Sequence, residues 1–164
     1  MEKGVDILKR KVIIIFLLIF TLINFTGCSM ISKISHDEKP TNYYYTNGLL
    51  TFYKNEVPQS MVVFYSDLYK EKTLDKANYV DMDNFLNSLK TENFVEKPSN
   101  LPEVPLYKIY IEFEKIKYVL NIYNEKYVSI YPWDGKYDMD FVDMSTIPIA
   151  YNLYGVCKFY LPDN

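Results

Sequence analysis

The sequence predicts an α+β domain in which an antiparallel sheet packs with one or two helices. Residues 106–144 alternate apolar and polar side chains, with short turns between the runs, as in antiparallel strands with one buried face. Residues 80–93 instead repeat apolar side chains at helical spacing. The stretch Ile147–Leu161 is apolar nearly all round, which favours a second helix and leaves a strand as the alternative.

The predicted single domain, residues 43–164, begins with a β-hairpin. Leu49–Tyr53 and Met61–Tyr65 are rich in apolar, aromatic and β-branched residues, and Pro58 lies in the polar segment between them. Such runs joined by turn residues indicate two neighbouring strands. Residues 66–78 are charged and irregular and predict no element.

A helix is predicted from Asp81 to Asn93. We expect Asp81 to be its N-cap, with Val80 stapled against Phe85. Three prolines after this helix exclude further helix and predict an extended connector. The apolar residues that recur at i, i+3, i+4 and i+7 are Met82, Phe85, Leu86 and Leu89.

Four consecutive strands, a meander, are predicted between residues 106 and 144. Asp134-Gly135 predicts a tight hairpin before the fourth strand. On that strand, Asp138 and Asp140 are expected to point outward. The side chains expected to face the core are Tyr107, Ile109, Ile111, Phe113, Tyr118, Leu120, Ile122, Val128, Ile130, Tyr137, Met139 and Phe141.

The opposite face of this meander carries the candidate binding residues. Four tyrosines alternate with the expected core positions, and Trp133, the only tryptophan, precedes the Asp134-Gly135 turn. Exposed aromatic side chains can anchor a partner or stack on a ligand. The alternatives are that a helix or the N-terminal hairpin covers this face, and that Trp133 folds back on its own hairpin. The four tyrosines are Tyr110, Tyr123, Tyr127 and Tyr131.

The N-terminus has the pattern of a secretory signal. Lysines and Arg10 precede an unbroken apolar run, Val12–Ile23, which is shorter than the roughly 20 residues that span a bilayer. Phe25-Thr26-Gly27-Cys28 resembles the bacterial lipobox, and the resemblance implies cleavage after Gly27 and lipidation of Cys28. Residues 1–27 are thus the predicted signal peptide and 28–42 a flexible tether to the membrane. The alternative is an uncleaved anchor over residues 12–28, and both place the domain outside the cytoplasm.

Composition excludes several functions. The formal net charge is −3 and no arginine follows Arg10, so nucleic acid is not an expected partner. His36 is the only histidine and lies in the predicted tether, which removes histidine-based nucleophile activation and histidine-rich zinc sites. Cys157 lies among apolar residues and is expected to be buried and unreactive.

The acidic residues near the last hairpin leave one further possibility. Asp134, Asp138, Asp140 and Asp143 do not have the spacing of a calcium-binding EF-hand loop. We therefore expect a solvated strand face, with no catalytic residue, no metal ligand and no cofactor. A small envelope hydrolase that uses two carboxylates is the alternative function.

A family resemblance agrees with the predicted location outside the cytoplasm. The segments 101–102, 105–113 and 131–135 resemble those of an uncharacterised family of small lipoproteins from low-GC Gram-positive anaerobes. The resemblance implies a surface lipoprotein of unknown role and supplies no catalytic residues. The sequence therefore predicts a non-enzymatic, membrane-anchored extracytoplasmic lipoprotein that binds a protein or an envelope component.

Overall fold

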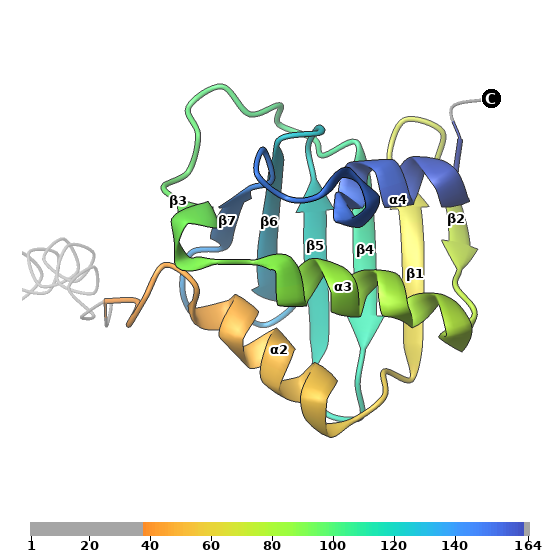
Figure 1. Cartoon of the computed structure of the whole chain (residues 1–164), viewed down its shortest axis with the longest axis horizontal. Helices are drawn as coiled ribbons and strands as arrows, with labels where there is room; N and C mark the ends of the chain where they lie inside the picture. Colours follow the sequence, from red (N-terminus) through yellow and green to blue (C-terminus); the bar gives the residue numbers. More distant parts are fainter. Residues whose placement is uncertain (1–37, 163–164) are drawn as a thin grey trace, which may run out of the picture. The chain divides into compact units, whose positions relative to one another are not determined.

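Seven strands form one antiparallel sheet in the order β2-β1-β4-β5-β6-β7-β3 (Figure 1). The computed structural model describes residues 38–162. The predicted signal peptide of residues 1–27, Cys28 and most of the predicted tether lie outside these residues. The strands are β1 (Ser60–Tyr65), β2 (Lys70–Thr73), β3 (Phe94–Val95), β4 (Tyr107–Glu112), β5 (Lys117–Ile122), β6 (Tyr127–Pro132) and β7 (Asp140–Asp143).

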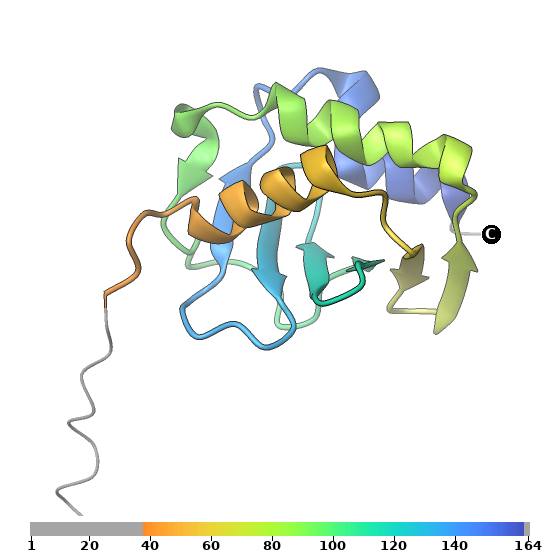
Figure 2. The same cartoon turned by 90° about the horizontal axis from the view of Figure 1, so that it is seen from below.

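The helices α2, α3 and α4 all lie on one face of this sheet (Figure 2). Leu49 of α2, Phe85 of α3 and Leu153 of α4 are each 0% exposed, and burying such a side chain stabilises the fold by about 1.5–3 kcal/mol. The helices are α2 (Tyr44–Asn55), α3 (Val80–Ser88) and α4 (Leu153–Tyr160), with short 3₁₀ turns η2 (Lys76–Tyr79), η3 (Thr91–Asn93) and η4 (Ile149–Tyr151).

The fold class is α+β as predicted, but the predicted N-terminal hairpin is wrong. Leu49–Tyr53 belongs to α2. Met61–Tyr65 does fall in a strand, β1, which pairs with β2 on one side and with β4 on the other. β2 comes from the segment that predicted no element, and all of its residues are exposed.

The predicted central helix is present but begins and ends differently. α3 follows η2 directly, so its N-cap is Tyr79 instead of Asp81. Val80 is 52% exposed and lies within the helix, so the predicted staple position does not exist. The helix ends at Ser88 because Leu89 is extended, short of Asn93.

The fourth predicted strand is displaced. The turn after Pro132 does not lead directly into a strand, and β7 begins only at Asp140. Ser129 pairs with Phe141, and Ile130 pairs with Asp140. Phe141 therefore shares the outer face with Ser129, while Asp140 points to the helix-covered face, the reverse of the prediction.

The apolar C-terminal stretch is helical, and the strand alternative is wrong. It divides into η4 and α4, and the Asn152 side chain caps α4 by accepting a hydrogen bond from the Tyr154 backbone N–H at 3.0 Å. Cys157 is 0% exposed, and burial raises the pKa of its thiol. No helix within residues 38–162 is long and apolar enough to cross a membrane.

Candidate functional site

The candidate binding residues lie on the face of the sheet opposite α2, α3 and α4, which we call the outer face (Figure 2). Val62, Tyr110, Val119 and Tyr131 form one cross-strand row on it. Lys108, Asn121, Ser129 and Phe141 form the next row. The predicted tyrosines are partly exposed, and Trp133 is 66% exposed.

A small core closes this face, on which none of the helices within residues 38–162 packs. Val119 is 1% exposed, Asn121 6%, Ser129 0% and Phe141 5%. Met139, from the loop before β7, places its sulfur 3.3 Å from Ser129 Oγ and 3.8 Å from Asn121 Nδ2. Long side chains and Met139 therefore cover the middle of the outer face and divide the candidate residues between its two ends.

At one end, Lys117 brings two aromatic rings together. Its ammonium lies 5.4 Å from the Tyr110 ring centroid and 5.9 Å from that of Trp133, within the range of cation–π attraction. Desolvation, with smaller contributions from Tyr131 and Glu71, raises the pKa of the Tyr110 hydroxyl. We call Tyr110, Lys117, Tyr131 and Trp133 the Lys117 cluster.

At the opposite end, Tyr123 and Tyr127 lie near a different lysine. Lys126 Nζ is 5.0 Å from the Tyr127 ring centroid and 3.4 Å from Asp143 Oδ2. A hydrogen bond with Tyr127 and the charge of Asp143 raise the pKa of Lys126. The Tyr123 hydroxyl lies 3.4 Å from Ser129 Oγ.

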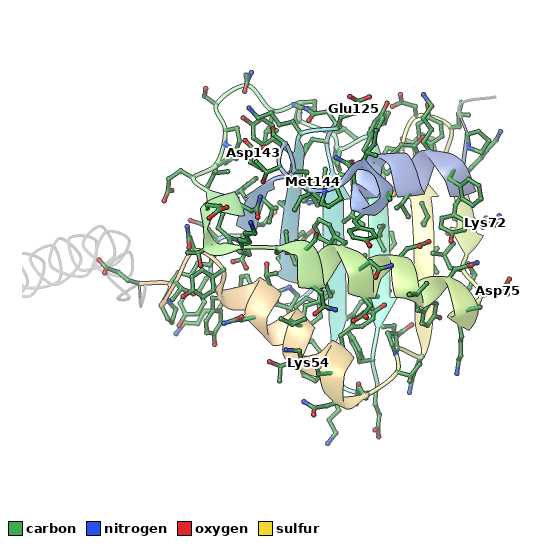
Figure 3. All side chains as sticks on the ribbon, viewed as in Figure 1. Lys54, Lys72, Asp75, Glu125, Asp143 and Met144 are labelled. Carbon is green, nitrogen blue, oxygen red and sulfur yellow. The ribbon has the colours of Figure 1, made fainter. Side chains whose placement is uncertain are left out.

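This end of the outer face is distant from the C-terminal part of α2. Asp143 and Glu125, which precedes Lys126 in the chain, lie at the opposite side of the molecule from Lys54 of α2 (Figure 3).

The structure separates the acidic residues that the sequence grouped. Asp140 is 0% exposed, and its Oδ2 accepts hydrogen bonds from the Thr46 backbone N–H at 2.7 Å and from Thr46 Oγ1 at 2.8 Å. Its Oδ1 lies 2.5 Å from Lys39 Nζ. Asp140 thus caps the first turn of α2 from a distant strand, and the expectation that it lies on a solvated face is wrong.

The other acidic side chains stay apart from Asp140. Asp134 and Asp138 are exposed. Asp143 Oδ1 accepts a hydrogen bond from the Ser145 backbone N–H at 2.8 Å. Within the described part of the chain, no three acidic, histidine or cysteine side chains gather as a metal site would require.

Sequence reasoning missed Lys117 as a member of the candidate site. The alternation of β5 places Lys117 on the same face as Val119 and Asn121, so its direction could be predicted. Its two ring contacts could not, because they depend on pairing of Lys117 with Glu112 and on the chain reversal that brings Trp133 N to Lys117 O at 2.7 Å.

Comparison with known proteins gives a family and a structural relative. The family model described as "Domain of unknown function (DUF4883)" matches residues 39–157. The crystal structure of the "Putative Lipoprotein from Clostridium perfringens" is 31% identical, with a TM-score of 0.67, over 74% of this chain and 96% of that chain. No curated protein matches the chain.

Proposed function

The chain belongs to the DUF4883 family of domains of unknown function, and from this premise we propose that it is a lipid-anchored extracytoplasmic lipoprotein that binds a protein or polymer of the cell envelope without catalysis. The family resemblance predicted from the sequence is confirmed, since the structural relative comes from a Clostridium species. The description of this relative as a putative lipoprotein supports the proposed extracytoplasmic location.

The Lys117 cluster carries the binding proposal. It combines a cation, an aromatic side chain that is 66% exposed, and two partly exposed tyrosines on a face without a helix. Aromatic side chains bury a large area at a small cost in conformational entropy, and a lysine can meet an acidic group of the partner. A partner surface with a carboxylate or phosphate next to an apolar patch suits this combination.

The arrangement of carboxylates favours binding over hydrolysis. A carboxylate-pair hydrolase needs two side chains that face one site about 5–9 Å apart. Asp138 is exposed, whereas Asp140 is buried against Thr46 and Lys39. Asp138 and Asp140 therefore lie in different environments and do not face one site.

Lipidation is tested by replacing Cys28 with alanine in cells. The Cys28→Ala protein should leave the membrane fraction or accumulate as uncleaved precursor, because the lipid cannot be attached. The Cys157→Ala variant is the control and should remain in the membrane fraction. Mature wild-type protein without the mass of acyl chains would contradict the proposal.

Binding is tested by capture from an envelope extract with the lipidated protein as bait. Trp133→Ala should weaken partner capture by roughly thirtyfold, as truncation of an interface hot spot does. Its folding free energy should change by less than about 0.5 kcal/mol because the side chain is mostly exposed. Tyr127→Ala tests whether the opposite end of the outer face also takes part.

The matched control is Phe159→Ala, since Phe159 is 79% exposed but lies on α4. It should capture the partner as well as the wild type. If Trp133→Ala and Phe159→Ala capture equally, the Lys117 cluster is not the binding surface. Unfolding of Trp133→Ala by several kcal/mol would show that Trp133 is structural.

A further inference from the structure

A hollow of about 760 Å³ borders α2, apart from the Lys117 cluster. One wall is a helical stripe at i, i+3, i+4 and i+7, formed by Tyr44, Asn47, Gly48 and Thr51. The other wall includes Ile116, which precedes β5, with Tyr118 of β5 and Pro132 at the end of β6. Its volume lies in the range of small-molecule binding sites.

The hydroxyl of Tyr118 is an unexplained polar group in this wall. The side chain is 3% exposed, and its ring packs at 6.2 Å from Phe52 and 6.4 Å from Phe113. Among residues 38–162, no hydrogen bond to its hydroxyl is formed, and the hydroxyl oxygen is not enclosed, because Tyr118 lines the hollow. Burial, followed by the charge of Asp140, raises the pKa of this phenol to about 12, so it remains a neutral donor at physiological pH.

Gly48 provides the space for this hydroxyl. A Cβ at position 48 would lie 2.6 Å from the Tyr118 hydroxyl oxygen. Glycine in the middle of a helix destabilises it relative to alanine, and here it leaves room for a hydroxyl that lines the hollow. A residue that disfavours its helix thus keeps a donor accessible at the hollow, and such local costs occur at functional sites.

The chemistry of the walls indicates a neutral ligand. Among residues 38–162, Lys54 is the only charged residue that lines the hollow. Tyr44 is 43% exposed and offers an aromatic ring. Thr51 Oγ1 donates to the Asn47 carbonyl at 2.8 Å, so its remaining capacity is that of an acceptor. A ligand that both donates and accepts, and that has an apolar face, would match these groups.

We propose that this hollow is a binding site for a neutral saccharide, with the Tyr118 hydroxyl as the donor and Tyr44 as the stacking platform. Sugar hydroxyls can accept from Tyr118 and donate to Thr51, while the C–H face of a sugar ring packs on Tyr44. The site is separate from the Lys117 cluster of the proposed function, so either can fail without the other.

The test uses the full lipidated protein in micelles of a detergent without a sugar headgroup. Tetra-N-acetylchitotetraose and maltotetraose are titrated into it, and the heat of binding is measured. At least one should bind the wild type. Tyr118→Phe should weaken that binding at least tenfold while the melting temperature stays within about a degree, because the ring keeps its packing and the hydroxyl makes no hydrogen bond within residues 38–162.

Two further variants separate this site from its surroundings. Gly48→Ala should also lose binding, because its methyl group displaces the Tyr118 hydroxyl. Trp133→Ala should bind the saccharide like the wild type even if it no longer captures an envelope partner. The proposal is overturned if neither saccharide binds, if Tyr118→Phe binds as well as the wild type, or if that variant melts several degrees lower.

Discussion

On one face the sheet is covered by α2, α3 and α4 (Figure 2). On the outer face it is covered by its own side chains and by Met139. Both faces exclude water in the middle, since Val63 on the first is 0% exposed and Val119 on the second is 1% exposed. The difference is in what covers them. Helices cover the first face, whereas side chains from neighbouring strands cover the outer face.

This difference indicates that the helix-covered face provides stability, whereas the outer face is better suited to binding a partner. The helix-covered face includes a buried carboxylate, Asp140, whose partners Lys39 and Thr46 lie together in the chain, so it joins two segments that are far apart in the sequence. The outer face ends in lysines and aromatic rings that can change rotamer without moving the backbone. A binding surface is therefore more easily accommodated on the outer face.

The largest effect is expected at Asp140. Asp140→Ala should destabilise the domain by about 3 kcal/mol, because it leaves the Thr46 N–H and hydroxyl without an acceptor and leaves Lys39 without its partner. Urea unfolding monitored by Trp133 fluorescence measures this change.

Asp140→Asn is the matched variant, since an amide oxygen can still accept from Thr46 but cannot neutralise Lys39. It should lose roughly half as much stability as the alanine variant. A loss below about 1 kcal/mol for Asp140→Ala would mean that this carboxylate neither caps α2 nor holds residue 39 to the domain.

Asp140 also explains why the sequence did not predict α2. The first turn of this helix has no acidic residue, and its N-cap Tyr43 makes no side-chain cap. The cap comes from Asp140, 94 residues further along the chain from Thr46. Without a local start signal, the aromatic and β-branched residues of Leu49–Tyr53 favoured a strand.

The prediction matched the structure where the local sequence pattern alone determines the secondary structure. The side chains of β4, β5 and β6 that were expected to face the core are buried, although among these strands burial alternates only along β4, and the apolar spacing of α3 placed Met82, Phe85 and Leu86 in the core. The β7 prediction failed because residues 133–139 form a longer connection than the tight turn expected from Asp134-Gly135. A shift of one residue then reversed the faces of Phe141 and Asp140.

The candidate sites show the same limit. Alternation put Tyr110 and Tyr131 on one face, and strand pairing was needed to place them in one row through Val119. The approach of Gly48 to Tyr118 joins a helix that the sequence missed to a strand that it predicted. No local pattern in the sequence indicates that contact.

A smaller effect is expected from identical deletions on the two faces. Val63→Ala should cost about 2 kcal/mol, because helices and strands around it cannot collapse into the cavity. Val119→Ala should cost about 1 kcal/mol, because the tyrosine and lysine side chains above it can relax. Equal losses in urea unfolding would show that the outer face is packed as rigidly as the helix-covered face.

The smallest effect concerns Asp143, which lies on β7 like Asp140 but on the outer face. Partial burial would raise its pKa, yet hydrogen bonds from Ser145 and the charge of Lys126 bring the pKa below its ordinary value of 3.8. The folded state therefore holds this proton less tightly than the unfolded chain. The resulting stabilisation is complete above the unfolded pKa and is lost as the pH falls through the folded pKa.

Asp143→Asn should accordingly reduce the free energy of unfolding by about 0.5 kcal/mol at pH 7, because the ion pair with Lys126 is partly exposed and screened. The difference from the wild type should shrink as the pH falls below the ordinary aspartate pKa. Lys126→Met, which keeps the Ser145 hydrogen bonds, should remove only part of it. Urea unfolding between pH 7 and pH 2.5 measures all three proteins, and a difference that grows on acidification would reverse the sign of this linkage.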